Sequence, residues 1–295
     1  NAARWKLSSG TRWKIRSAQY LAKSHVPRPL RRQAVHLSFY NGRNFGDALS
    51  PIITEFALGE PVVEAHFAGA DLSAIGSILD PLERWKNPRR PFAWGSGFIK
   101  EGPRWSGRPI RPVAVRGELS AERVAHLADE PLALGDPGLL VRRLYPELLH
   151  VAKRYPVSLI PHISETFDPA VREAQDALPA LHVIDVRADP RQVLEEIAAT
   201  SVVLSSSLHG LICADALEVP NVWVPLTGDL GGGDYKFRDY YSPFGREPNP
   251  VPFEAAVAEP EAHASLWRPL EGLDQVLDRL LAAFPREELL SLYRR

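Results

Sequence analysis

The chain of 295 residues contains one cysteine, Cys213, and this scarcity excludes a disulfide framework and any cysteine-based zinc cluster. Its apolar runs fall far short of the ~20 residues that a membrane-spanning helix needs. No secretory signal is evident, because the basic N-terminus is not followed by an apolar core and a small-residue cleavage site. These features predict a cytoplasmic protein.

Acidic residues are missing from the start of the chain. Residues 1–46 contain no Asp or Glu, but they contain ten basic residues: Arg4, Lys6, Arg12, Lys14, Arg16, Lys23, Arg28, Arg31, Arg32 and Arg43. The rest of the chain is acidic, with 25 basic residues against 36 acidic ones. We expect the basic segment 1–33 to contact an anionic membrane surface peripherally, and the alternatives are a solvated tail or a helix packed on the body.

From residue 34 onward, short β-rich runs alternate with helical stretches, which predicts parallel sheets built from βαβ units. The predicted strands are Ala34–Tyr40, Pro61–Phe67, Leu72–Leu79, Pro91–Gly97, Pro112–Val115, Leu132–Gly138, Val157–Pro161, Leu181–Val186, Val202–Ser205 and Asn221–Val224. The predicted fold is α/β, with Rossmann-like lobes over residues 34–150 and 151–250 and a helical extension over 251–295. In such sheets ligands bind beyond the carboxyl ends of the strands, so the residues that follow strands are the candidates for a site.

The segment Val202–Leu217, VVLSSSLHGLICADAL, is the strongest local signal. A buried strand leads into Ser205, Ser206 and Ser207, and His209 stands at the start of a predicted helix. Free backbone N–H groups and the positive end of the helix dipole make such a junction suitable for an anion. A histidine there can bind phosphate or move a proton. Alternatively, the serines only cap the helix and His209 packs against the sheet.

The same segment resembles the polysaccharide pyruvyl transferase family, and four other motifs agree in order. They are Tyr40-Asn41-Gly42-Arg43-Asn44-Phe45-Gly46-Asp47, Gly95-Ser96-Gly97, Val115-Arg116-Gly117-Glu118-Leu119-Ser120 and Gly135-Asp136-Pro137, with the helix after the serines leading to Pro220-Asn221-Val222-Trp223. The resemblance covers roughly residues 34–241. It implies a GT-B-like fold with phosphoenolpyruvate bound in the cleft between the lobes, and transfer of its pyruvyl group to a sugar diol as a cyclic ketal, with release of phosphate.

The resemblance places the functional arginine and histidine of the family on Arg116 and His209, and it adds Tyr40 and Asn44 to the substrate-binding candidates. The acceptor is expected to be a glycan or a lipid-linked sugar. Many family members have an arginine two residues before the histidine, where this chain has Ser207. We interpret the serine as the mark of a subtype that modifies exopolysaccharide repeat units, so another cation has to share the phosphate.

Phosphoenolpyruvate carries a phosphate and a carboxylate, so its site needs several cations. Arg116 follows a predicted strand and can form a planar two-bond contact to either group; the alternative is a surface arginine paired with Glu118 or Glu122. Lys236 and Arg238 lie in GGGDYKFRDYY, residues 231–241, which suits a mobile loop that closes over an anion. The alternative is a flexible connector with solvated charges.

The reaction also needs a proton donor for the methylene carbon and a base for the sugar hydroxyl. His209 and Asp47 are the candidates, and the residue types do not decide which one protonates carbon. Asp47 follows Gly46 at a predicted helix start, so its alternative role is a helix N-cap.

Other functions fit the sequence less well. A glycosyltransferase of the same two-lobe fold would use a nucleotide-sugar, but neither a base-stacking pocket nor an acidic ribose ligand is identifiable. A non-catalytic membrane-associated partner in polysaccharide assembly would explain the basic N-terminus and Ser207. The acidic body argues against nucleic acid. His162, His182 and His209 lack ligand spacing, so we predict no metal and no cofactor besides the donor substrate.

Overall fold

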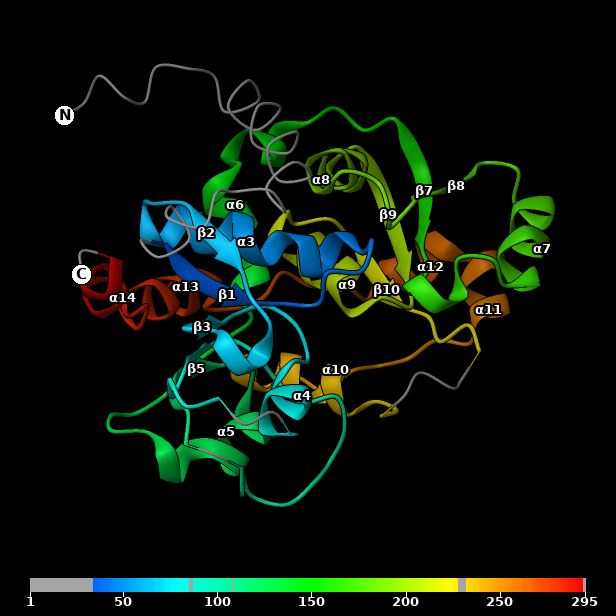
Figure 1. Cartoon of the computed structure of the whole chain (residues 1–295). Coiled ribbons are helices and arrows are strands. Elements are labelled where there is room, and N and C mark those ends of the chain that lie inside the picture. The colour runs from blue at the N-terminus through cyan, green and yellow to red at the C-terminus, as the bar shows by residue number, and fades with distance from the viewer. Residues whose placement is uncertain (1–33, 85–86, 108, 228–231, 294–295) are drawn as a thin grey trace, which may run out of the picture.

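The computed structural model describes residues 34–84, 87–107, 109–227 and 232–293 (Figure 1). Their strands form two sheets in which every recorded pairing is parallel. The six-stranded sheet has the order β2 (Val62–Glu64), β1 (Val35–Ser38), β3 (Leu72–Ser73), β4 (Phe92–Trp94), β5 (Arg111–Val115) and β6 (Ala133–Leu134). The four-stranded sheet has the order β10 (Asn221–Trp223), β9 (Thr200–Ser205), β7 (Tyr155–Ile160) and β8 (Leu181–Val183). The predicted α/β fold with two Rossmann-like parallel sheets is confirmed.

The helices connect and cover these strands. Those of the first half are α3 (Phe45–Leu58), α4 (Leu79–Arg84), α5 (Glu118–Val124) and α6 (Val141–Leu144), with short 3-10 turns η3 (Phe67–Gly69), η4 (Ala125–Leu127), η5 (Pro137–Leu140) and η6 (Pro146–His150). Those of the second half are η7 (Ile163–Glu165), α7 (Pro169–Ala177), α8 (Pro190–Ala198), α9 (Leu208–Ala216), α10 (Tyr235–Tyr241), η8 (Ser242–Phe244), α11 (Phe253–Ala258), α12 (Pro260–Ala264), α13 (Leu273–Ala282) and α14 (Arg286–Tyr293).

Local chemistry explains where helices begin. α8 starts with Pro190 after Asp189, whose carboxylate accepts hydrogen bonds from the backbone N–H groups of Arg191 and Gln192. α7 starts in the same way, with Pro169 after the capping residue Asp168. Pro at the first helical position and Asp at the cap are the favoured pair at such starts, so the local sequence explains where both helices begin.

The strand orders place a topological switch in each sheet. The chain reverses direction across the first sheet between β1 and β3, and across the second sheet between β7 and β9. Parallel sheets of this type bind ligands beyond the carboxyl ends of the strands at the switch. The loops after β1, β3, β7 and β9 are therefore the first places to look for a site.

The two sheets are not separated by solvent. One hydrophobic cluster includes Leu37 and Phe45 from the first half and Ile184 and Leu211 from the second. The backbone N–H of Phe45 donates to the carbonyl of Val186 at 2.8 Å, which joins the start of α3 to the loop after β8. The predicted boundary at 150/151 stays a prediction, but the core is continuous across it.

The C-terminal helices divide between the sheets. α11 and α12 lie against the second half, whereas α13 and α14 return to the first sheet (Figure 1). There the indole N–H of Trp94 on β4 donates to the carbonyl of Leu280 at 2.8 Å. The helical extension predicted over residues 251–295 thus consists of α11 to α14, and α13 covers the edge of the sheet at β6.

Two local predictions are wrong. The predicted strand Leu72–Leu79 ends at Ser73, because Gly76 turns the chain with a φ of 102° and Leu79 begins α4. The loop predicted over residues 231–241 is helical from Tyr235 onward, because Tyr235, Phe237 and Tyr240 are buried along one side of α10. Nothing is described for residues 228–231, and the predicted membrane-contacting segment 1–33 also lies outside the described residues.

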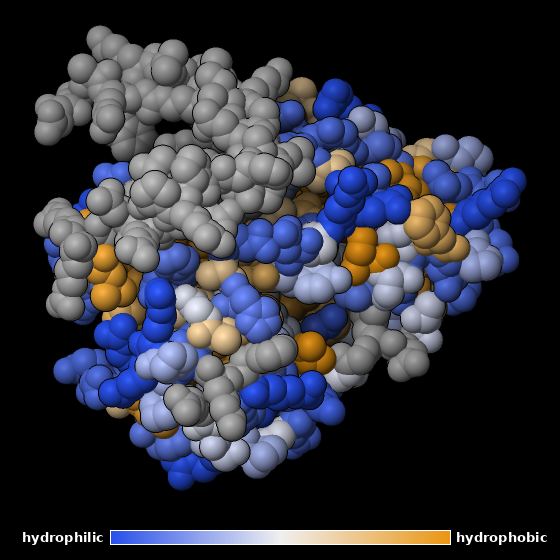
Figure 2. Space-filling model, viewed as in Figure 1, coloured by the Kyte–Doolittle hydropathy of each residue, from blue (hydrophilic) through white to orange (hydrophobic). Residues whose placement is uncertain are grey.

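The surface offers little apolar area on the face shown in Figure 2, where hydrophilic residues dominate and hydrophobic ones are scattered. None of the helices within the described ranges is long and apolar enough to cross a membrane.

Candidate active site

Polar side chains gather where the carboxyl ends of the two sheets meet. Asp47 lies in the first turn of α3, after β1, and Asp136 follows β6. His209 lies in the first turn of α9, after β9, and Glu165 ends the turn η7 after β7. Lys236 reaches this region from α10. Its positive charge is one of the influences on the pKa of both Asp47 and His209, and in each case it acts to lower the value. The sites predicted separately in the two halves therefore come together.

Asp47 is held in a dry environment. It is the third residue of α3 and not its N-cap, which is Asn44, so the capping alternative is wrong. The amide of Asn44 donates to Asp47 Oδ2 at 2.6 Å. Burial raises the pKa of Asp47 to about 7, an effect that the Asn44 hydrogen bond opposes and the charge of Asp136 reinforces. A large part of Asp47 is therefore protonated near neutral pH.

His209 lies against the start of α3. A Cβ added to Gly46 would be 2.2 Å from His209 Nδ1, so only glycine allows this approach. The ring nitrogen Nε2 is buried and has no hydrogen-bond partner among the described atoms. Burial lowers the pKa of His209 to about 3, and the charges of Arg116, Lys236 and His162 contribute. The imidazole is therefore neutral, which suits a proton acceptor and not a phosphate-binding cation.

The three serines have different surroundings. Ser205 Oγ donates to the carbonyls of Ile160 and Ser207, both at 2.9 Å, so it stabilises the strand-to-helix turn. Ser206 Oγ donates to Glu165 Oε2 at 2.5 Å and accepts from the backbone N–H of His162 at 2.8 Å. Ser207 precedes α9, and its side chain makes no capping hydrogen bond there. Of the three, Ser207 keeps its hydroxyl available for a ligand.

Arg116 is completely buried, so the alternative of a surface arginine paired with Glu118 or Glu122 is wrong. Its guanidinium contacts Asp239 at 2.9 Å, Ser77 Oγ at 2.8 Å and the carbonyl of Phe98 at 2.6 Å. Gly97 packs directly on it, since a Cβ there would be 2.4 Å from Arg116 Cζ. The positive charge acts on the site, because it lowers the pKa of both His209 and Lys236. Direct contact with a donor would require this set of bonds to rearrange.

Lys236 and Arg238 both lie on α10, but they differ in how far they are buried. Lys236 is half-buried, and its ammonium lies 5.2 Å from the ring centroid of Phe237 but forms no hydrogen bond or ion pair with the described part of the chain. Burial first, and then the charge of Arg116, lower the pKa of Lys236 to about 8, while the carboxylates of Glu165 and Asp47 oppose the shift. Arg238 is exposed. Lys236 is therefore the cation placed to complement an anion at this site.

Tyr40 lies at the outside of the site. Its side chain is 59% exposed, and its ring covers Gly42, where an added Cβ would be 2.1 Å from a ring carbon. The exposed ring can contact a substrate at the surface of the protein, away from the buried groups of the site.

Two residues of the cluster, Asp136 and Glu165, were missed as functional candidates by sequence reasoning. Asp136 is fully buried; the N–H of Gly138 donates to its Oδ1 at 2.8 Å, and its Oδ2 has no partner among the described atoms. Burial raises its pKa to about 6. The Gly135-Asp136-Pro137 motif was the available signal for this residue. No sequence motif pointed to Glu165, which also accepts hydrogen bonds from the backbone N–H and the hydroxyl of Thr227.

No group of three or more His, Cys, Asp or Glu side chains that could hold a metal ion occurs in the described ranges. The absence of a metal from the reaction stays a prediction.

Two parallel α/β sheets thus bring an acid, a neutral histidine and a lysine together at their joined carboxyl edges, which is a candidate site for an anionic small molecule. The sequence pattern of the polysaccharide pyruvyl transferase family matches residues 44–227, so the chain belongs to this family. The predicted family is thereby confirmed.

Two relatives were found by sequence. The chain is 28% identical over 233 residues to the succinoglycan biosynthesis protein ExoV of Rhizobium meliloti (strain 1021), covering 76% of this chain and 69% of that protein. It is 29% identical over 165 residues to the uncharacterized protein L143 of Acanthamoeba polyphaga mimivirus, covering 54% of this chain and 56% of the other.

Proposed function

We propose that this protein transfers the pyruvyl group of phosphoenolpyruvate to two hydroxyls of a sugar, forming a cyclic pyruvate ketal in exopolysaccharide or glycolipid synthesis. Membership of the family supports pyruvyl transfer, and similarity to a protein of succinoglycan biosynthesis supports an exopolysaccharide acceptor. The acceptor in this proposal is a glycan or a lipid-linked sugar, and the donor binds between the lobes in a GT-B-like arrangement.

One observation carries the proposal: Asp47 and His209, from different sheets, are brought together by the contact between Gly46 and the imidazole ring. Burial raises the pKa of the carboxyl to about 7 and lowers that of the imidazole to about 3. Near neutral pH the site therefore holds a protonated acid next to an unprotonated base. Acid–base catalysis requires a protonated acid beside an unprotonated base, and a bound anion would raise the pKa of His209 toward the working range.

We assign the proton donor to Asp47 and the base to His209. Asp47 protonates the methylene carbon, which becomes a methyl group and leaves an oxocarbenium-like centre at the neighbouring carbon. One sugar hydroxyl attacks that centre as His209 accepts its proton. The bond from this carbon to the phosphate oxygen breaks, and the second hydroxyl closes the ketal. Of the two hydroxyl protons, one replaces the proton given to carbon and the other leaves on the phosphate, so the reaction balances.

The groups around the departing phosphate fit this assignment. Lys236 provides a half-buried ammonium that forms no hydrogen bond or ion pair with the described residues, and the buried charge of Arg116 adds to the positive potential. The hydroxyl of Ser207 and the first N–H groups of α9 add hydrogen-bond donors. A cation placed on developing charge stabilises the transition state more than the ground state.

The location of the protein is part of the proposal. We infer that it acts on the cytoplasmic side of the membrane and that the basic residues 1–33 hold it loosely at the anionic surface. The support is the composition of that segment, because cationic residues near such a surface each contribute about 1 kcal/mol.

The test is an assay of phosphate release from phosphoenolpyruvate with a panel of lipid-linked and synthetic glycosides. We expect release that depends on an acceptor diol and a product that is heavier by one ketal-linked pyruvate. Phosphoenolpyruvate should also raise the melting temperature without added metal, since a ligand that binds only the folded state stabilises it. If nucleotide-sugars stabilise the protein and are consumed while phosphoenolpyruvate does neither, the assignment is wrong.

A further inference from the structure

The start of α5 is capped by side chains from a distant part of the chain. Asp239 of α10 accepts hydrogen bonds from the backbone N–H of Ser120, at 2.8 Å, and from its hydroxyl, at 2.6 Å. Ser242 Oγ, one turn further along, accepts from the backbone N–H of Glu118 at 2.8 Å. The first N–H groups of a helix have no partner within the helix, so α10 supplies the caps that α5 lacks.

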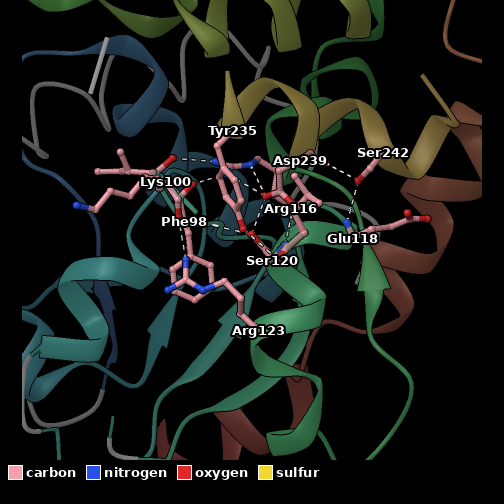
Figure 3. Close-up of polar contacts among 12 residues, drawn as sticks. Phe98, Lys100, Arg116, Glu118, Ser120, Arg123, Tyr235, Asp239 and Ser242 are labelled. Carbon is pink, nitrogen blue, oxygen red and sulfur yellow. Dashed lines mark hydrogen bonds and ion pairs between the residues drawn. The ribbon is translucent and has the colours of Figure 1, made fainter. Parts of the chain in front are cut away.

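The two segments are also in steric contact. A Cβ added to Gly117 would be 1.7 Å from the backbone carbonyl oxygen of Asp239, so α10 rests on the backbone that precedes α5. The hydroxyl of Tyr235, at the other end of α10, donates to the carbonyl of Leu119 at 3.0 Å. Figure 3 shows these residues around Arg116, whose guanidinium lies between Asp239 and the carbonyl of Phe98. The helix is thus held along its length by the first lobe.

Lys236 is the residue of α10 that lies at the candidate active site. It has no hydrogen bond or ion pair with the described residues to keep its ammonium in place. Its position therefore depends on the helix that carries it, and that helix depends on Asp239 and Ser242. Because Asp239 is fully buried, a shift of α10 would leave the buried charges of Asp239 and Arg116 without their partners, which is costly.

We propose that Asp239, with Ser120 and Ser242, is a latch that fixes α10 on the first lobe and thereby positions the Lys236 ammonium. The latch is the set of contacts of Asp239 and Ser242 with residues 116–120. The contact of Lys236 with the donor rests on the proposed function. The inference about the position of Lys236 does not.

The first experiment needs no substrate. The lysines are reductively methylated with ¹³C-formaldehyde, and the dimethylamino signal of Lys236 is assigned by its loss in Lys236→Arg. In the wild-type protein we expect this signal to be separate from those of exposed lysines. In the variants Asp239→Asn, Ser120→Ala and Ser242→Ala, the Lys236 signal should move toward the signals of the exposed lysines. The serine variants keep the buried ion pair, so they answer the question even if Asp239→Asn does not fold.

A matched control is Asp71→Asn. Asp71 is another buried carboxylate of the first lobe, and it pairs with His36 and Arg89. It precedes β3, so it lies at the amino ends of the strands and not at the carboxyl ends that carry the candidate site. This variant should lose stability without moving the Lys236 signal. An unchanged Lys236 signal in all three latch variants, or an equal change in Asp71→Asn, would overturn the latch.

The second experiment asks whether the latch acts on the donor through Lys236, using the KM for phosphoenolpyruvate in a double-mutant cycle. Asp239→Asn should raise KM about tenfold, the effect of a misplaced charged contact, and should have little further effect in a Lys236→Ala background. An Asp239→Asn effect that persists in full in the Lys236→Ala background would show that Asp239 does not act through Lys236 and would overturn the latch. If wild-type protein does not use phosphoenolpyruvate at all, the proposed function fails, while the Lys236 signal still decides the latch.

Discussion

The carboxyl edges of the two sheets carry opposite chemistry for the same physical reason. The six-stranded sheet provides carboxyl groups, Asp47 and Asp136, whose pKa burial raises to about 7 and about 6. The four-stranded sheet provides His209, whose pKa burial lowers to about 3. Desolvation disfavours the charged form of either type of group. One dry junction therefore keeps the acid protonated and the base unprotonated, which exposed side chains do not achieve at neutral pH.

The largest expected effect comes from removing the base of the second edge. His209→Ala should lower turnover by about 10² to 10⁴-fold, the range for positioned proton transfer. Folding should survive, because Nε2 has no partner to be left unpaired. The measurement is kcat with a glycoside acceptor, together with the melting temperature. His182→Ala is the control. His182 lies on β8 of the four-stranded sheet and is paired with Glu196 of α8, outside the cluster. A variant that melts early and keeps its specific activity would make His209 a packing residue only.

The next effect tests the acid of the first edge, where activity and stability should change in opposite directions. Asp47→Asn should lower turnover by about 10²-fold. In the wild type, kcat/KM for the donor should fall as pH rises through about 7, because Asp47 then loses its proton.

The stability effect of Asp47 has a defined sign. An unfolded carboxyl ionises near 3.8 but the folded one only near 7, so the folded state loses stability as pH rises between these values. The difference corresponds to on the order of 4 kcal/mol at pH 7 and above. Asp47→Asn should therefore be more stable than wild type to urea at pH 8 and nearly equal at pH 4. Lower stability of the variant at pH 8 would contradict the raised pKa.

A smaller effect is expected from the cation that lies between the edges. Lys236→Ala should raise KM for phosphoenolpyruvate by about tenfold, and Lys236→Arg should recover part of the loss. Arg238→Ala, two residues along the same helix but exposed, should change KM by less than about threefold. Steady-state kinetics with a saturating acceptor gives both values. Equal effects of the two alanine variants would remove the distinction between them.

The smallest effect on turnover should come from the segment that precedes both sheets. Deleting residues 1–29 should leave activity on a soluble acceptor nearly unchanged, because the candidate groups all lie beyond residue 34. Binding to anionic vesicles should weaken, at about 1 kcal/mol for each basic residue near the surface. Cosedimentation with vesicles of phosphatidylglycerol, against neutral phosphatidylcholine vesicles, measures this. Unchanged vesicle binding would end the membrane proposal.

The sequence by itself determined the parallel α/β fold, nearly every strand and the family. These follow from local properties: hydrophobic alternation, Pro and Asp at helix starts, and short motifs after strands. The sequence also placed Asp47, Ser206 and His209 after the right strands, since carboxyl-end loops follow from the order of elements. What it could not determine were partnerships over long separations. Arg116 pairs with Asp239, 123 residues away, and Gly46 meets His209 only because both sheets share one core. Burial, and with it the protonation state of each group, exists only once those distant segments exclude water together, so the chemistry of the site was decided by the tertiary structure.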